Sequence, residues 1–138
     1  MIIRPDHKNC GYPRRGDVYY VSSKNTGSTG SEQRSNRHAV IVSNNYANRK
    51  SNTVQIVYIT TRNKLYHRTN VDISLPASDK LPPLHREAIC NQVMTVDKSR
   101  LDERKGRLSP EQMTEIDNAI ASNLGLQIIN RKDDRCYA

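Results

Sequence analysis

The run Thr53–Thr61, TVQIVYITT, constrains the fold more than any other part of the chain. It is rich in β-branched residues that favour an extended strand, and Gln55 is the one poor strand former near its centre. A strand that is apolar on both of its alternating faces is typically buried on both sides. We therefore expect Thr53–Thr61 to be the central strand of a sheet.

Other segments supply the neighbours of this strand and the loops between them. Val71–Leu75 alternates as a half-buried strand does, and residues 76–86 contain three prolines and predict a loop. Residues 22–36 are rich in Ser, Gly and Asn, which predicts a long mobile loop, and residues 46–52 predict a shorter polar loop. The other expected strands are 18–21, 38–42 and 88–96.

One helix is indicated at its start, along one face and at its end. Ser109, Pro110 and Gln112 form a capping-box pattern with proline at the first helical position. Gly125 is the expected C-terminal stop. Strands followed by a single helix predict a small antiparallel barrel or coiled sheet capped by that helix. The apolar residues at helical spacing are Met113, Ile116, Ile120 and Leu124.

The supply of apolar residues limits the size of this barrel. Only 35% of the 138 residues are apolar, and the chain has no Trp and no Phe. This is enough for one small domain, but the core is thin, which favours an oligomer that shares burial. We expect a single domain at residues 14–130, an N-terminal extension at residues 1–13 and a polar tail at residues 131–138.

The formal charge of +8 is concentrated in the first two thirds of the chain. Residues 1–50 carry nine Lys and Arg against three Asp and Glu, and residues 51–100 carry seven against four. Residues 101–138 carry six against seven. A basic excess favours a polyanionic partner such as nucleic acid, an acidic protein or an anionic membrane surface.

Several function classes find no support in the sequence. No apolar run approaches the roughly 18 residues of a transmembrane helix, and Met1–Asp6 lacks the apolar core of a signal peptide. Cys10, Cys90 and Cys136 are scattered, so we expect no disulfide framework and a reducing cytoplasm. Neither metal-ligand spacing nor a phosphate-binding glycine loop is present, so we expect no metal and no cofactor.

A dense set of polar side chains, Ser31–Arg37, leads into the strand 38–42. A guanidinium at the start of a strand is held more rigidly than one at a loop tip, and it can offer two parallel donors to a phosphate. Composition alone favours the plainer interpretation that Arg34 and Arg37 are solvated surface charges.

Short motifs in a fixed order favour the first of these interpretations. Arg15–Tyr20, then Gly30–Gln33 with Arg37, then Val40–Asn44 resemble the opening of the MazF/PemK family of toxin endoribonucleases. The resemblance spans roughly residues 14–128 and lies in the combination of motifs. Later matches are Ile59–Thr60, Gln92–Val93, Thr95–Lys98, Arg100–Leu101 and a terminal helix that ends in Leu124–Leu126.

The resemblance implies a fold and an activity. The fold is mainly β with α, an SH3-like small antiparallel barrel with a C-terminal helix, and it works as a homodimer. The activity is sequence-specific cleavage of single-stranded RNA without metal, held in check by an acidic antitoxin whose tail fills the RNA groove. The ribose 2′-hydroxyl attacks its own 3′-phosphate, and the products are a 2′,3′-cyclic phosphate or 3′-phosphate and a 5′-hydroxyl.

The resemblance also implies roles for particular residues. Arg37 matches the arginine that stabilises the phosphorane and is a candidate proton donor to the leaving oxygen, and Thr60 matches a threonine that hydrogen-bonds the scissile phosphate. Glu32, Ser31 or a water would accept the 2′-hydroxyl proton. Thr60 is also an ordinary strand former, and Ser31 and Glu32 are also ordinary loop residues. Further candidate RNA contacts are Gln33, Arg34, Asn36, His38, Thr61, Arg62, His67 and Arg68.

The chain departs from the family pattern beside the expected site. His38 replaces the usual proline, which removes a φ constraint and adds an imidazole. It is either a tolerated substitution at a strand start or a participant in proton transfer. Asn91 and Ala88 stand where the family often has an acidic residue and a serine.

A non-catalytic barrel is the alternative. Strand tyrosines such as Tyr19, Tyr20 and Tyr58 would then serve as a stacking platform for nucleic acid. A topoisomerase poison resembling CcdB is disfavoured, because that protein relies on a C-terminal tryptophan and this chain has none.

Overall fold

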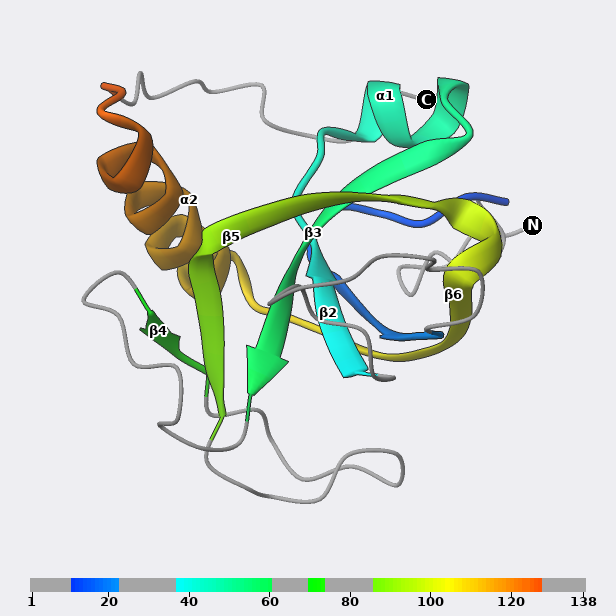
Figure 1. Cartoon of the computed structure of the whole chain (residues 1–138), viewed down its shortest axis with the longest axis horizontal. Helices are drawn as coiled ribbons and strands as arrows, with labels where there is room; N and C mark the ends of the chain where they lie inside the picture. The colour runs from blue at the N-terminus through cyan, green and yellow to red at the C-terminus, as the bar shows by residue number, and fades with distance from the viewer. Residues whose placement is uncertain (1–10, 23–36, 61–69, 74–85, 128–138) are drawn as a thin grey trace, which may run out of the picture.

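The computed structural model describes residues 11–22, 37–60, 70–73 and 86–127. Its strands form one six-stranded sheet of order β4-β5-β3-β2-β1-β6, and every neighbouring pair is antiparallel. The sheet is strongly curved, with α2 on one side of it (Figure 1). The elements are β1 (Asp17–Val21), β2 (Arg37–Ile41), α1 (Asn45–Lys50), β3 (Thr53–Thr60), β4 (Val71–Asp72), β5 (Glu87–Asp97), the 3-10 turn η3 (Lys98–Arg100), β6 (Leu101–Arg107) and α2 (Pro110–Leu124).

β3 is the central strand that the sequence predicts, because it lies between β2 and β5. Its side chains from Ile56 to Thr60 are all buried, and Gln55 is exposed. Burial on both sides follows from two separate apolar layers. One layer packs beneath α2 and includes Val18, Val40, Val57, Met113 and Ile116. The other, here called the inner layer, contains Val21, Ala39, Ile41, Val54, Ile56, Tyr58, Ile89 and Val96.

A corner in β5 curves the sheet around the inner layer. Val57 pairs with Val93, but Ile59 pairs with Ala88, so β5 carries extra residues opposite β3 at this point. Such a bulge bends the strand and increases its twist. After the corner β5 runs on through η3 into β6, which pairs with β1 at the far edge (Figure 1).

α2 has the boundaries and caps that the sequence predicts. The Ser109 hydroxyl accepts a hydrogen bond from the Gln112 N–H at 3.1 Å, and the Gln112 side chain accepts from the Ser109 N–H at 2.9 Å. Gly125 ends the helix with a φ of 73°, in the left-handed region that favours glycine. The predicted apolar face is covered only in part, since Leu124 is 58% exposed.

Two elements differ from the sequence-based expectation. Residues 45–50 form α1, so the prediction of a polar loop over 46–52 was wrong for most of that segment. The helix depends on polar contacts rather than on apolar spacing: Asn44 accepts from the Ala47 N–H at 2.8 Å, and the buried Asn48 amide donates to the Ser43 carbonyl at 2.9 Å. The charged segment 101–107 forms β6, for which the sequence indicated no strand.

β4 is also shorter than expected. The predicted strand Val71–Leu75 is a strand only at Val71–Asp72, followed by the buried Ile73. Its last two residues lie outside the described part of the chain, as do all but Ser22 of the predicted loop 22–36 and all but Arg86 of the predicted loop 76–86.

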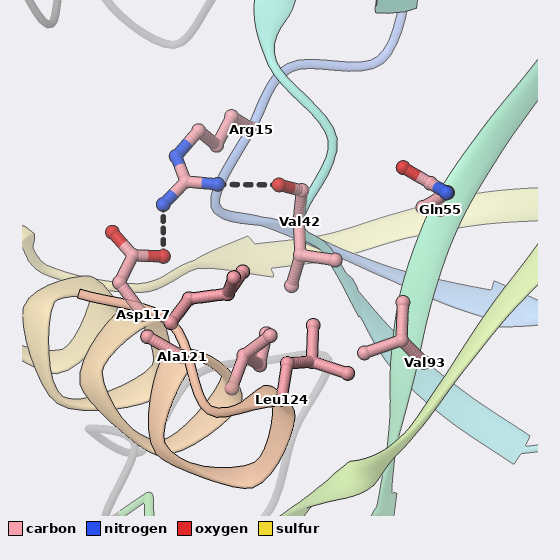
Figure 2. A pocket seen from close by; sticks show the side chains of 9 residues that line it. Arg15, Val42, Gln55, Val93, Asp117, Ala121 and Leu124 are labelled. Atoms are coloured by element: carbon pink, nitrogen blue, oxygen red, sulfur yellow. Dashed lines mark hydrogen bonds and ion pairs between the residues drawn. The ribbon is translucent and has the colours of Figure 1, made fainter. Parts of the chain in front are cut away.

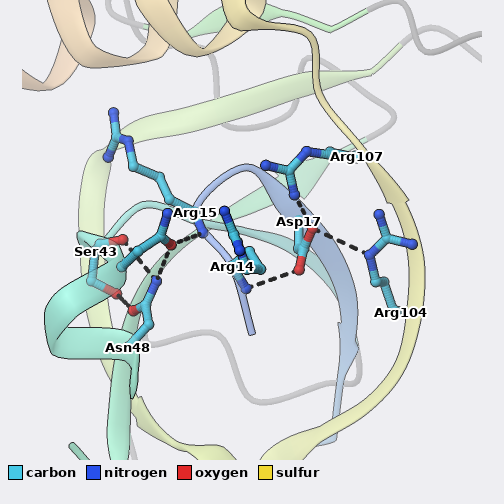
Figure 3. Close-up of polar contacts among 8 residues, drawn as sticks. Arg14, Arg15, Asp17, Ser43, Asn48, Arg104 and Arg107 are labelled. Atoms are coloured by element: carbon cyan, nitrogen blue, oxygen red, sulfur yellow. Dashed lines mark hydrogen bonds and ion pairs between the residues drawn. The ribbon is translucent and has the colours of Figure 1, made fainter. Parts of the chain in front are cut away.

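A buried carboxylate holds β6 against β1. Asp17 is 1% exposed, and Figure 3 shows it between arginines of both segments. It accepts from the Arg14 N–H at 2.9 Å and from the Arg107 guanidinium at 2.7 Å, and the Arg104 Nε lies 3.2 Å away. The charge of Asp17 is therefore compensated by two arginines of β6 and by the Arg14 backbone N–H, as a buried charge requires.

The two residues before Asp17 extend the connection to the rest of the fold. The Arg15 guanidinium donates to the Val42 carbonyl and pairs with Asp117 of α2 (Figure 2). Gly16 has a φ of 95°, its N–H donates to the Ile41 carbonyl at 2.8 Å, and its carbonyl accepts from the Leu108 N–H at 2.9 Å. The three consecutive residues Arg15–Asp17 thus connect the start of β1 to β2, β6 and α2 through hydrogen bonds and ion pairs.

Replacing Asp17 by asparagine should strongly destabilise the fold. Asp17→Asn removes the charge that Arg104 and Arg107 share, and we expect the free energy of unfolding to fall by about 3 kcal/mol. Urea unfolding followed by circular dichroism measures this. Asp102→Asn, at an exposed position of the same strand β6, is the control and should change the free energy by under about 0.5 kcal/mol. Equal stability of the two variants would contradict the role of Asp17.

Candidate functional site

The predicted residues Arg37 and Thr60 lie at the same end of neighbouring strands. Arg37 begins β2 and Thr60 ends β3, and these strands are antiparallel. The register pairs Ala39 with Tyr58. Arg37 and Thr60 are each two residues beyond this pair, so side-chain alternation puts both on the face that bears the inner layer.

The guanidinium of Arg37 lies over an aromatic ring. Its central carbon lies 5.9 Å from the centroid of the Tyr58 ring, within the range of a cation–π contact. Burial lowers the pKa of Arg37, and the neighbouring Tyr58 acts in the opposite direction. The group still carries its charge at neutral pH, because arginine titrates far above that range. A partly desolvated cation interacts more strongly with a phosphate than a fully solvated one.

Arg100 joins the same group from η3. Its Nη2 donates to the Tyr58 hydroxyl at 3.4 Å, and its Nε donates to the Ser22 carbonyl at 2.7 Å. The Ser22 N–H donates in turn to the Arg100 carbonyl at 2.8 Å. Because Val21 pairs with Arg37, both ends of segment 23–36 start from fixed positions beside the site.

Glu87 is a candidate that sequence reasoning missed. It pairs with Thr60 across β3 and β5, so both side chains lie on the same face, and the Asn70 amide donates to its carboxylate at 3.2 Å. The signal in the sequence was weak, because Glu87 only begins the predicted strand 88–96. Its place opposite Thr60 depends on the register shift in β5.

His38 points to the other face of β2. Its ring meets the Tyr20 ring edge-on at a centroid distance of 5.1 Å, and Tyr20 is its cross-strand partner in β1. Burial lowers the pKa of His38, and the nearby charges of Lys105 and Arg86 lower it further. This placement, with Arg37 on the opposite face, favours a structural role over proton transfer.

The remaining predicted residues divide into two groups. Ala88 is buried in the layer beneath α2, and Asn91 is half-buried at the corner of β5. Tyr58 is 1% exposed and so cannot offer its face to a base. The other group lies outside the described part of the chain and comprises Ser31, Glu32, Gln33, Arg34, Asn36, Thr61, Arg62, His67 and Arg68.

Cys90 is buried, and burial raises the pKa of its thiol to about 12, so its role is in packing.

Among residues 11–22, 37–60, 70–73 and 86–127, no three His, Cys, Asp or Glu side chains are grouped as a metal site requires. The helices in these ranges are too short or too polar to cross a membrane.

The low pKa of His38 predicts a pH-dependent stability. Below about pH 6.5 the unfolded chain binds a proton at this histidine more readily than the folded chain does, so the free energy of unfolding should fall as the pH drops. His38→Gln should remove part of that decline and have little effect above pH 7.5, measured by urea unfolding from about pH 8 to pH 5. Parallel pH profiles for parent and variant would contradict the assignment.

Comparison with known proteins places this chain in a family. Residues 14–124 match the family described as PemK-like, MazF-like toxin of type II toxin–antitoxin system. The Endoribonuclease MazF of Staphylococcus saprophyticus is 39% identical over 117 residues, which cover 84% of this chain and 94% of that relative. This agrees with the resemblance predicted from the motifs.

Solved structures give the same result for the fold. An endoribonuclease in complex with its cognate antitoxin, from a mycobacterial species, is 28% identical with a TM-score of 0.62, over 86% of this chain and 99% of that one. MazF from Deinococcus radiodurans has a TM-score of 0.66 at 22% identity, over 83% of this chain and 98% of that one, which confirms the predicted barrel with a C-terminal helix. The chain belongs to the PemK-like, MazF-like family of toxins of type II toxin–antitoxin systems.

Proposed function

We propose that this chain is an endoribonuclease toxin that cleaves single-stranded RNA without a metal ion, at a site centred on Arg37 and Thr60. The observation that carries the proposal is a half-buried guanidinium at the start of β2, on the same face and at the same end as a buried threonine of β3. The 39% identical relative is named an endoribonuclease.

The proposed reaction is an internal phosphoryl transfer. The ribose 2′-hydroxyl loses its proton and attacks the adjacent phosphorus, and the bond to the 5′-oxygen of the next nucleotide breaks as that oxygen gains a proton. Arg37 donates hydrogen bonds to the non-bridging oxygens, whose charge grows in the transition state. Thr60 hydrogen-bonds the same phosphate. Candidate acceptors of the 2′-hydroxyl proton are Ser31, Glu32, Glu87 and a water.

The positive charge of the chain bears on its proposed contacts with RNA and with an antitoxin. The net charge of +8 supports a polyanionic substrate, and binding should weaken with salt. The candidate contacts outside the described residues stay Gln33, Arg34, Asn36, Thr61, Arg62, His67 and Arg68, whereas His38, also predicted as a contact, faces away from Arg37. An acidic antitoxin that occupies the same basic surface is the proposed protein partner, in line with the mycobacterial neighbour's complex with its cognate antitoxin. We expect both in the cytoplasm.

A second copy of the chain is the proposed partner of an apolar groove at the end of α2. The groove encloses about 480 Å³, and Val42, Ile120 and Ala121 form part of its wall (Figure 2). Val93, Leu124 and Leu126 line it as well and are 38%, 58% and 62% exposed. A domain with so thin a core gains from covering such side chains in a homodimer.

Loss of the Arg37 guanidinium should abolish most cleavage. Arg37→Ala should lower the single-turnover rate by about 100-fold, because one donor to the developing charge is removed. The assay uses a pool of RNA in EDTA with mapping of the cut ends, which should be 5′-hydroxyls at one short motif. Arg49→Ala, an exposed arginine of α1, is the control and should cleave as the parent does. Cleavage that requires Mg²⁺ would contradict the proposal, and binding without cleavage would favour the non-catalytic alternative.

Charges in the apolar groove should dissociate the dimer. Leu124→Glu combined with Leu126→Glu should shift the mass in light scattering from twice 15.7 kDa to 15.7 kDa, because each carboxylate would be desolvated at the interface. Tyr46→Glu changes another exposed apolar side chain, on α1, and should leave the mass unchanged. A parent protein that is already monomeric, or a dimer in both variants, would contradict this interface.

A further inference from the structure

Tyr58 is unusual among the side chains of β3. The inner-layer residues before it on this strand, Val54 and Ile56, are aliphatic, whereas Tyr58 brings a phenol into the same buried layer. At 1% exposure it has no route to an RNA base. A hydroxyl buried this deeply needs a partner, and Arg100 supplies one at 3.4 Å.

The two ends of the Tyr58 side chain are both fixed. The backbone is held in the central strand of the sheet, and the phenol oxygen accepts from Arg100. Arg100 is itself fixed, because its Nε donates to the Ser22 carbonyl at 2.7 Å. The ring is therefore a rigid surface at the base of the site.

Arg37 lies on this surface. Its guanidinium carbon is 5.9 Å from the ring centroid, so the negative face of the ring attracts the cation. The ring can cover only a face of the guanidinium, and the N–H groups lie in the guanidinium plane, which is the geometry that suits bidentate donation to a phosphate. A side chain as long as arginine has many rotamers, and a site of this kind needs its donors held to within about 0.5 Å.

We propose that Tyr58 is a positioning residue, which holds the Arg37 guanidinium in the orientation that meets the scissile phosphate while Arg100 holds Tyr58. The inference rests on the proposed function, because Tyr58 can affect cleavage only if Arg37 takes part in it. Tyr58 acts through Arg37 and touches no substrate. The ring contacts Arg37, and the hydroxyl only holds the ring in place. Loss of the ring should therefore lower the cleavage rate more than loss of the hydroxyl.

Two substitutions separate these parts. Tyr58→Phe keeps the ring and should stay within about 3-fold of the parental single-turnover rate, and Tyr58→Leu removes the ring and should lower the rate by about 10-fold or more. KM should change by less than about 2-fold in both, because the orientation of Arg37 matters most in the transition state. Ile56→Ala creates a defect in the same inner layer on the same strand and is the control, with a lower melting temperature and a rate within about 2-fold of the parent.

A double-mutant cycle with Arg37 tests the mechanism itself. In the Arg37→Ala background the further change Tyr58→Leu should lower the residual rate by less than about 2-fold, because the group that it positions is gone. An equal loss in both backgrounds, or a loss in Ile56→Ala as large as in Tyr58→Leu, would mean that Tyr58 acts only through packing and would overturn the inference.

A spectroscopic readout tests the placement independently of activity. The Nε–H resonance of Arg37, assigned by its absence in Arg37→Ala, should carry a ring-current shift that persists in Tyr58→Phe and disappears in Tyr58→Leu. An unchanged resonance in Tyr58→Leu overturns the contact. A parent protein that cleaves no RNA in EDTA overturns the proposed function, whereas cleavage that depends on Arg37 and not on Tyr58 overturns the positioning role alone.

Discussion

The buried carboxylate of Asp17 is the contact on which the closure of this small sheet depends. It draws Arg104 and Arg107 of β6 onto the start of β1, at the edge farthest from β4. β6 is largely charged, and Leu101 is its one apolar side chain that packs against the inner layer. Without this pairing the curved sheet would open at β1, and water would reach the inner layer.

Closure of the sheet also builds the site. β6 follows directly on η3, which brings Arg100 beside Ser22 and Tyr58. The last residue of β1, Val21, pairs with Arg37, so the arginine proposed to act on phosphate is fixed by the same strand that Asp17 anchors. The contacts that stabilise the sheet thus also position the proposed site. In this chain Arg15–Asp17, part of the motif that resembles the family, makes several of these contacts.

Elements with an apolar period could be predicted from the sequence, and elements held by polar contacts could not. β3 and α2 follow from runs of apolar residues and a capping box. α1 depends on side-chain hydrogen bonds of Asn44 and Asn48, and β6 depends on an ion pair with a residue far away in the chain. The motifs found Arg37 and Thr60, but Tyr58 was interpreted as a stacking platform. Its burial agrees with the expectation that this strand is buried on both sides, but its contacts with Arg37 and Arg100 depend on residues far away in the chain.

The anchored ends of segment 23–36 have a consequence for how such a toxin can diversify. Val21 and Arg37 pair with each other, and Ser22 accepts a hydrogen bond from Arg100, which lies outside the segment. The backbone of Arg37 is therefore placed by strand pairing that does not depend on the length of this segment. Under the proposed function, the positions of this segment other than the candidate proton acceptors Ser31 and Glu32 are therefore where target selection can change while Arg37 and Thr60 keep their places on β2 and β3.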